Sequence, residues 1–324
     1  MTLPAILTVT VNAALDRTWL VPGLKRRGVN RPARTLVRAG GKGVNVARAY
    51  ACLGGSAVAT GFVGGATGRT LRRALAEEGI GDAFLAVPGE TRTCAVIVDP
   101  DRAHIELYEA GAPVARADAA RLLRRIRRLL AGGRFSWLVL SGSLPPGVPD
   151  SFYADAVRLA HAAGVSAAVD AAGPALAQAI AARPALVKPN RDELRGVAGP
   201  LRDGAAIVRA ADRLRRRGAQ RVVVTLGDAG AIMVDDAGAR RIAAMKVAAV
   251  SAVGSGDCFL AGLIAGLCDG DAAGALRLAA IAGADNCRRL GAGTIDATAV
   301  RRLERGPGLR VTALPAARAR AGAA

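Results

Sequence analysis

The sequence has few aromatic residues, and this scarcity limits both its core and its partners. Aromatic residues make up 3% of the 324 residues, whereas hydrophobic residues make up 52%. The core must therefore be built from Ala, Val and Leu, and few rings are available to stack on nucleic-acid bases. The length suits one large α/β domain or two small ones.

Cysteine is also scarce, and long apolar runs are absent. The five cysteines contain no CxxC pair, which argues against a disulfide framework or a zinc site and fits a reducing cytoplasm. No stretch approaches the roughly 18 consecutive apolar residues that a membrane span needs, so we expect no membrane partner. The apolar N-terminus lacks a preceding basic region and indicates a first strand over residues 5–11, not a signal peptide.

Lysine and histidine are rare, although the chain is strongly basic. Four lysines leave 41 arginines among the 45 basic residues, and the formal net charge is +19. Such a charge could attract nucleic acid. However, residues 120–131 alternate arginines with Leu and Ile at helical spacing, which indicates one solvated helix face. We therefore expect no nucleic-acid partner, and we interpret His104 and His161 as structural or surface residues.

Short strand-like runs alternate with longer helical patterns, which predicts βαβ units and a mostly parallel sheet. Apolar runs such as LVLS, AAVD and VVVTLG indicate strands covered on both faces. Residues 12–38 and 91–110 are expected to form a small antiparallel sheet over one edge. We expect one domain over residues 1–310 and a flexible tail over 311–324. The predicted helices span residues 43–53, 68–78, 118–130, 150–163, 205–217, 257–267 and 272–290.

A glycine turn followed by an aspartate opens the predicted helix at residue 257. The backbone amides of Gly254, Ser255 and Gly256 could hold an anion at the positive end of the helix dipole. Asp257 could then accept a proton from an attacking hydroxyl, or it could only cap the helix. The residues leave these two roles equally open. Neither a Walker A loop nor a GxGxxG fingerprint is present.

Two further clusters could carry chemistry. The GGKG run at residues 40–43 precedes a helix with Asn45 in its first turn, and it adds Lys42 to the same glycine geometry. On its own this is a weak signal, and the alternative is an ordinary strand-to-helix turn with a solvated lysine. In LVKPNRDEL, Asn190 and Glu193 are three residues apart at a helix start. They could organise a hydrated Mg²⁺ or form a capping box, and the two roles are compatible.

Several segments, in this order, carry a resemblance to a known family: TVTVNAALD, VNR, AGGKGVNVARA, GATG, SGSLPPGVP, LVKPNRDEL, VVVTLGDAGA, AVGSGDCFLAG and a late GAGT. The chain resembles the ribokinase-like sugar kinases, specifically the phosphofructokinase B family, from about residue 7 to about residue 296. The resemblance implies a three-layer α/β/α domain with a mostly parallel central sheet and a small β-sheet lid, often used for dimerisation. It also implies transfer of the ATP γ-phosphoryl group to a sugar or sugar-phosphate hydroxyl, with Mg²⁺.

The resemblance also implies roles for individual residues. Asp257 would be the catalytic base, with Gly254, Ser255 and Gly256 as the anion hole. Asn190 and Glu193 would organise the metal. The sugar hydroxyls would be held by Asp16, Gly40, Gly41 and Asn45, and the nucleotide side would be formed by Lys188, Thr225, Gly227 and Gly230.

GGKG and VNR look like the branch of 1-phosphofructokinases and tagatose-6-phosphate kinases. Arg92 matches an arginine that holds the phosphate already on the substrate, where a guanidinium fork suits the dianion, and Lys42 is expected to help it. We therefore expect a cytoplasmic, homodimeric, ATP-dependent kinase acting on fructose 1-phosphate. Tagatose 6-phosphate and fructose 6-phosphate are alternative acceptors. A catalytically dormant, Arg-rich nucleic-acid-binding protein is the alternative from a different class.

Overall fold

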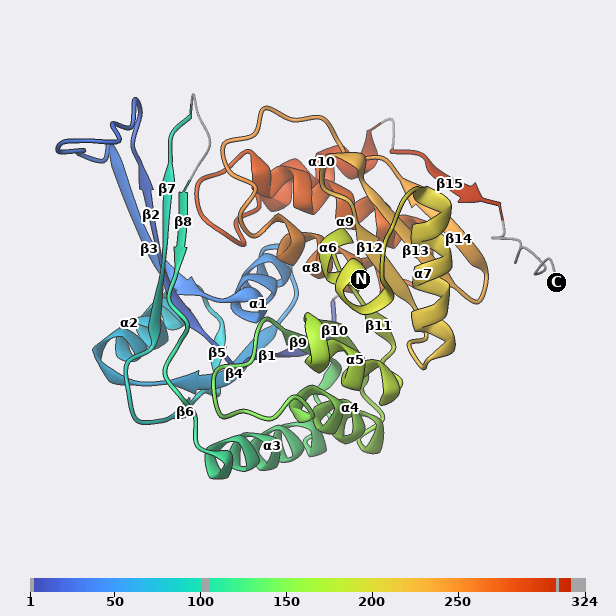
Figure 1. Cartoon of the computed structure of the whole chain (residues 1–324), viewed down its shortest axis with the longest axis horizontal. Helices are drawn as coiled ribbons and strands as arrows, with labels where there is room; N and C mark the ends of the chain where they lie inside the picture. The colour runs from blue at the N-terminus through green and yellow to red at the C-terminus, as the bar shows by residue number, and fades with distance from the viewer. Residues whose placement is uncertain (1–2, 101–104, 307–308, 316–324) are drawn as a thin grey trace.

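The computed structural model describes residues 3–100, 105–306 and 309–315, in which a large sheet covered by helices carries a smaller sheet at one end (Figure 1). The strands of the large sheet are β1 (Ala5–Thr10), β4 (Ala57–Val63), β5 (Gly81–Asp82), β6 (Leu85–Ala86), β9 (Phe135–Ser141), β10 (Ser166–Asp170), β11 (Leu186–Val187), β12 (Val222–Thr225), β13 (Ala231–Asp235), β14 (Gly238–Ile242) and β15 (Val311–Leu314).

The large sheet has the order β15-β14-β13-β12-β11-β10-β9-β1-β4-β5, and β6 also pairs with β4. All neighbours from β12 to β5 are parallel, whereas β13, β14 and β15 are added antiparallel. The carboxyl ends of the parallel strands therefore meet at one edge, which is where open α/β sheets bind ligands.

Helices cover both faces of the large sheet, as the family resemblance implied. One face carries α1 (Lys42–Cys52), α2 (Gly65–Glu77), α8 (Ser255–Leu267), α9 (Ala272–Cys287) and α10 (Ala297–Arg305). The other face carries α3 (Arg116–Ala131), α4 (Phe152–Ala162), α5 (Gly173–Ala181), α6 (Arg191–Ala198) and α7 (Gly204–Arg216). Successive side chains enter opposite cores, with Leu138 in one and Val139 in the other. This explains why the strands read as continuous apolar runs.

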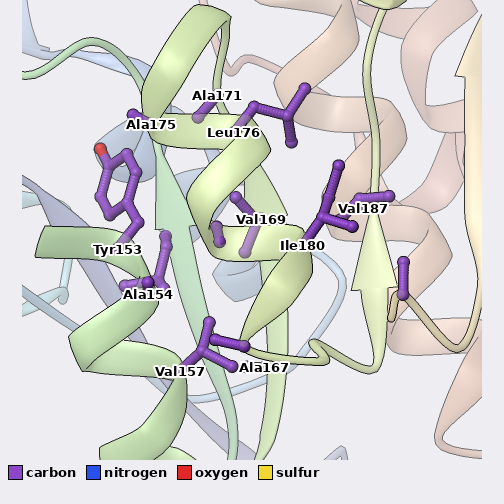
Figure 2. Packing of buried hydrophobic residues seen from close by; sticks show 14 of the residues in the cluster. Tyr153, Ala154, Val157, Ala167, Val169, Ala171, Ala175, Leu176, Ile180 and Val187 are labelled. Carbon is purple, nitrogen blue, oxygen red and sulfur yellow. The ribbon is translucent and has the colours of Figure 1, made fainter. Parts of the chain in front are cut away.

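The packing of α4 and α5 on β10 shows how Ala and Val replace aromatic residues in this core. Val157 of α4 lies near Ala167 of β10, and Ile180 of α5 lies near Val187 of β11 (Figure 2). Small strand side chains let the helices approach closely. Each fully buried Leu or Ile contributes about 1.5–3 kcal/mol through removal from water.

The smaller sheet forms a lid with the order β3-β2-β7-β8, and it stands off the left of the domain in Figure 1. Its strands are β2 (Ala14–Leu20), β3 (Arg34–Gly40), β7 (Arg92–Val98) and β8 (Ile105–Tyr108). The predicted lid is confirmed, but the prediction that it is wholly antiparallel is wrong, because β2 and β7 pair in parallel. Both strands run outward from the large domain, with Ala14 beside Arg92 at the base. His104 lies outside the described residues.

The end of the chain differs from the predicted flexible tail. Val311–Leu314 form β15, which pairs with β14 from Val311 beside Ile242 to Leu314 beside Ala239. Residues 316–324 lie outside the described residues. The helices α5 and α10 were not predicted either, although Asp296 marks the start of α10 by accepting hydrogen bonds from the Thr298 and Ala299 amides.

The basic segment at residues 120–131 forms part of α3, and its apolar side is buried as predicted. Leu122, Ile126 and Leu130 lie in the core, while Arg125 donates to the Ala83 carbonyl at 2.7 Å. Arg125 of this basic segment therefore forms a hydrogen bond within the protein. Among the described helices, we find none with the length and hydrophobicity of a membrane span.

Candidate active site

A cavity of about 1330 Å³ lies at the carboxyl ends of the parallel strands. Thr10 of β1, Asp170 of β10 and Thr225 of β12 line it, together with Arg92 from the base of the lid. Apart from Gly40, every site residue predicted from the sequence lines this cavity. The tertiary structure therefore brings the three separate sequence clusters into one site.

The glycine turn at the start of α8 is open toward the cavity. Gly254 is the N-cap and has the left-handed φ of 82°, and a Cβ there would lie 2.6 Å from the Gly293 nitrogen, so only glycine fits. By contrast, a Cβ on Gly256 would meet nothing closer than the Lys188 Nζ, 3.6 Å away. An anion at this turn would therefore meet the helix N-terminus and the Lys188 ammonium together.

Within that turn, two of the amides already have backbone partners. The Ser255 amide donates to the Ala252 carbonyl at 3.1 Å, and the Asp257 amide donates to the Gly254 carbonyl at 3.1 Å. Of the three amides predicted to form the cradle, that of Ser255 is therefore already engaged. The Ser255 hydroxyl accepts from Asn286 Nδ2 at 3.1 Å, which holds the turn against α9.

Asp257 does not cap α8, so the structural alternative to its catalytic role is wrong. The N-cap is Gly254, which makes no side-chain capping bond, and the buried Asp257 carboxylate instead accepts from Asn45 Nδ2 at 2.8 Å. Burial, with the nearby Asp170 carboxylate, raises the pKa of Asp257 to about 7. Such a carboxyl group can take up a proton near neutral pH, as a general base must.

Asp170 is a charged residue of the cavity that the sequence prediction did not include in the site. It ends β10 fully buried, with Lys42 Nζ 3.2 Å from Oδ1 and Lys188 Nζ 3.1 Å from Oδ2. Burial acts to raise the pKa of Asp170, but the two ammonium groups outweigh it and hold that pKa below its usual value. A carboxylate directly after an apolar parallel strand was the signal in the sequence.

Lys42 is engaged differently from the prediction that it helps Arg92 hold a substrate phosphate. Its ammonium lies 3.2 Å from both Asp170 and Glu193. Chiefly because of Asp170, and despite burial, the pKa of Lys42 is raised above its usual value. Lys42 therefore belongs to a charged cluster that links α1, β10 and the start of α6.

The predicted capping box at residues 190–193 is confirmed. Asn190 Oδ1 accepts from the Glu193 amide and Glu193 Oε2 accepts from the Asn190 amide, each at 2.8 Å. The other Glu193 oxygen faces Lys42. In the described part of the chain, no group of three or more His, Cys, Asp or Glu side chains is placed to hold a metal ion directly.

The predicted sugar side lies between β2, β3 and α1. A Cβ on Gly40 would overlap the Asp16 carboxylate, so glycine at this position makes room for the acid. Burial raises the pKa of Asp16 to about 6, and the nearby Arg48 and Arg92 charges oppose the rise. Gly41 is the N-cap of α1 with φ 98°, and it places Asn45 in the first turns of that helix.

Arg92 is held at the base of the lid by carbonyl groups. Its guanidinium donates to the Asn12 carbonyl at 3.0 and 3.2 Å and to the Glu109 carbonyl at 2.9 Å. These bonds orient the planar group, which lines the same cavity as Asp257. A fixed guanidinium is a suitable partner for an anionic group on a ligand.

The predicted nucleotide side lies beyond the lysines, after β12. Thr225 ends that strand, and Gly227 and Gly230 bound the short turn that follows. A Cβ on Gly230 would overlap the Ile242 carbonyl of β14, so packing alone requires glycine there. Gly227 has no such neighbour within 4 Å, and its side of the turn is open.

Comparison with known proteins identifies a family and similar sequences over most of the chain. The family model described as pfkB family carbohydrate kinase matches residues 9–299. A 1-phosphofructokinase from Rhodobacter capsulatus is 40% identical over 263 residues, which cover 80% of this chain and 82% of that protein. A tagatose-6-phosphate kinase from Staphylococcus epidermidis is 30% identical over 266 residues, which cover 81% and 85%.

Similarity to a solved structure extends over nearly the whole fold. Phosphofructokinase-2 from Escherichia coli superposes with a TM-score of 0.84 and 30% sequence identity, covering 93% of this chain and 98% of that chain. The chain therefore shares most of its fold with a known architecture.

Proposed function

The chain belongs to the pfkB family of carbohydrate kinases, and we propose that it phosphorylates fructose 1-phosphate on its 6-hydroxyl with ATP as the donor. The observation that carries this proposal is that a buried carboxylate, Asp257, shares one cavity with a fixed guanidinium, Arg92. A sugar phosphate carries the matching pair of groups, a hydroxyl to be activated and a phosphate to be held. The relatives named 1-phosphofructokinase support the same acceptor.

In this reaction the 6-hydroxyl oxygen forms a bond to the γ-phosphorus while the bond from that phosphorus to the leaving oxygen of ADP breaks. Asp257 takes the hydroxyl proton. The turn at Gly256 and the Lys188 ammonium face the charge that spreads over the phosphoryl oxygens. Closure of the lid over the sugar side would exclude water and so limit phosphoryl transfer to water.

The nucleotide would lie along the carboxyl ends of β11 and β12. Thr225 and the open turn at Gly227 line that part of the cavity, and Lys188 lies next to Gly256 at the start of α8. Glycine at position 230 permits the turn, because a side chain there would overlap the β14 backbone behind it.

We also propose that Mg²⁺ accompanies the nucleotide and neutralises part of the phosphate charge. Asn190 and Glu193 would hold it through water, because their oxygens already serve the capping box and the Lys42 ion pair. Magnesium suits such a site, since it keeps several of its waters and needs few protein ligands.

The lid is proposed to pair two copies of the chain. Its exposed apolar side chains include Val37, Ile105, Leu107 and Tyr108. These lie on the small sheet and would be buried by a second copy of the same sheet. If so, Leu107→Glu should convert a dimer into a monomer in sedimentation experiments. We place the protein in the cytoplasm, which its five free cysteines fit.

The test is ADP release from ATP and Mg²⁺ by the purified protein, with fructose 1-phosphate, tagatose 6-phosphate, fructose 6-phosphate and free fructose compared by kcat/KM. The Asp257→Asn variant serves as the blank. A preference for fructose 1-phosphate is expected. A preference for tagatose 6-phosphate would transfer the proposal to that acceptor, which the relative named tagatose-6-phosphate kinase supports. Absence of turnover with every acceptor, together with salt-dependent nucleic-acid binding, would overturn it.

A further inference from the structure

A buried arginine in α1, Arg48, contacts four separate parts of the protein behind the cavity. Only 5% of the residue is exposed. Its Nε donates to Glu78 Oε2 at 2.7 Å, at the end of α2. Its Nη1 donates to Asn45 Oδ1 at 2.9 Å and to the Ala292 carbonyl at 3.0 Å, and its Nη2 donates to the Ala39 carbonyl of β3.

The bond to Asn45 decides which way the asparagine amide faces. A guanidinium only donates hydrogen bonds, so it must meet the amide oxygen. The amide nitrogen is thereby left to face Asp257, to which it donates at 2.8 Å. The reversed amide would place two donors together at Arg48 and two acceptors together at Asp257. Arg48 therefore selects the orientation in which Asn45 supports an ionised Asp257.

Two further contacts of Arg48, to Ala292 and Ala39, lie behind the glycine turn at residues 254–256 (the anion turn) and at the base of the lid. Ala292 and Gly293 pack against Gly254, where a Cβ would lie 2.7 Å from the Ala292 Cα. Ala39 directly precedes Gly40, which makes room for Asp16. The Arg48 side chain thus contacts Asn45, which bonds to Asp257, and Ala292, which packs against the anion turn. It also contacts Ala39 of β3, the strand that belongs to the lid.

We propose that Arg48 is a positioning residue for phosphoryl transfer. Arg48 fixes the orientation of the Asn45 amide toward Asp257, and it holds the anion turn and strand β3 in place relative to Asp257. This inference rests on the proposed kinase function for its kinetic consequences. Arg48 does not line the cavity, so it acts through Asn45, Ala292 and Ala39 without touching substrate.

The charged groups acting on Asp257 come from three elements. Asp170 of β10 raises its pKa, whereas Lys42 of α1 and Lys188 after β11 lower it, and so does the bond from Asn45. If Asn45 no longer donates to Asp257, one of the contributions that lower the pKa of Asp257 is lost. The proton affinity of Asp257 should therefore rise, and the acidic limb of the activity profile should move to higher pH.

The kinetic experiment compares Arg48→Met, Arg48→Lys and Glu78→Gln with the unchanged protein. Arg48→Met should lower kcat about 10- to 100-fold, with the KM for ATP nearly constant, because small misplacements at a reacting centre carry losses of this size. Arg48→Lys keeps the charge but cannot reach all four acceptors, and should recover only part of the rate. Glu78→Gln removes the ion pair remote from the cavity, and should alter thermal stability without shifting kcat or the acidic limb.

A double-mutant cycle separates positioning from a general structural role. In an Asn45→Leu background, Arg48→Met should cause little further loss of kcat, because the amide that it positions is already gone. Independent, additive losses in the two variants would overturn the inference. So would a Glu78→Gln variant whose losses match those of Arg48→Met.

A second measurement does not depend on turnover. The chain has five asparagines, so selective ¹⁵N-asparagine labelling yields few side-chain amide signals. The Asn45 signal, assigned with an Asn45→Leu variant, should titrate near pH 7 with Asp257 and should lose or shift that titration in Arg48→Met. An unchanged titration would overturn the inference even if the protein phosphorylates sugars. A changed titration without sugar phosphorylation would overturn the proposed function alone.

Discussion

The two glycine turns that open α1 and α8 resemble each other in sequence but differ in what fills them. Both N-caps are glycines with positive φ, Gly41 and Gly254, and neither makes a side-chain capping bond. In the α1 turn, a Cβ on Gly43 would overlap the Thr10 hydroxyl and lie 3.1 Å from the Val9 carbonyl. In the α8 turn, Gly256 faces open cavity.

This difference shows that glycine at a helix start has two separate uses. The α1 turn uses it so that the helix can pack on β1, which brings Lys42 and Asn45 to the site. The α8 turn uses it so that a ligand can approach the helix N-terminus. A GGKG run and a GSGD run can therefore be told apart only by what lies opposite each glycine.

The largest expected effect is on the α8 side of this comparison, at its carboxylate. Asp257→Asn should lower kcat about 10²- to 10⁴-fold, since a general base contributes that much, and should leave the KM for ATP nearly unchanged. Steady-state ADP release with saturating fructose 1-phosphate measures it. A variant that retains most of its kcat would show that Asp257 is not the base.

A matched pair of glycine variants tests the comparison directly. Gly256→Ala should keep the fold and lower kcat about 10- to 100-fold, because the methyl group enters space next to Lys188 that the phosphoryl group needs. Gly43→Ala should instead destabilise the protein by about 1–3 kcal/mol, because its methyl group overlaps protein atoms. Thermal unfolding and kcat, measured on both, check this. If both variants lost stability equally, the α8 turn would be packed and not open.

A smaller effect concerns the pH dependence of the reaction. Burial raises the pKa of Asp257 to about 7, and the base must be ionised to accept a proton. The kcat/KM should therefore fall about tenfold per pH unit well below pH 7. Asp257→Asn should show no such limb in its residual activity. A limb that persists unchanged in this variant would assign the titration to another group, such as Asp16.

The smallest expected effect is on stability. The pKa of Asp257 is about 7 in the folded protein and 3.8 without its surroundings, so folding favours the protonated form. The resulting stabilisation is complete below about pH 4 and is lost as the pH rises through 7. Asp257→Asn cannot ionise, and its Tm at pH 8 should exceed that of the unchanged protein by a few degrees. Asp269→Asn, at an exposed carboxylate, is the control and should give no gain.

Much of the fold could be predicted because its strands and helices have distinct local patterns. The apolar run ending at Ser141 and the Leu/Ile spacing in residues 120–131 were sufficient to predict β9 and α3. Short or unpatterned elements were missed: β15 is four residues long, and the Ala-rich α5 lacks a polar face that would mark it. The parallel pairing of β2 with β7 joins segments about 80 residues apart, which no local pattern encodes.

The candidate site was also predicted only in part from the sequence. The residue types in the GSGD, GGKG and NRDE clusters already indicated an anion turn, a helix start and a capping box. The partner of each charged group was not available from spacing, so the ion pairs of Lys42 with Asp170 and Glu193 were not predicted. Asp170 and Arg48 were missed because their roles depend in part on contacts between distant segments, such as Lys42 with Asp170, 128 residues apart, and Arg48 with the Ala292 carbonyl, 244 residues apart.

The sequence by itself determined the α/β architecture, the helix-start glycines and the chemical groups available for catalysis, because these depend on neighbours within one or two turns of the chain. Only the tertiary structure decided that Asp257 is held by Asn45 and does not cap α8, that Lys42 pairs with Asp170 and Glu193, and that the α8 turn is the open one. The physical reason is that burial, ion pairing and the space opposite a glycine are set by whichever distant elements the packing of the sheet and helices places there.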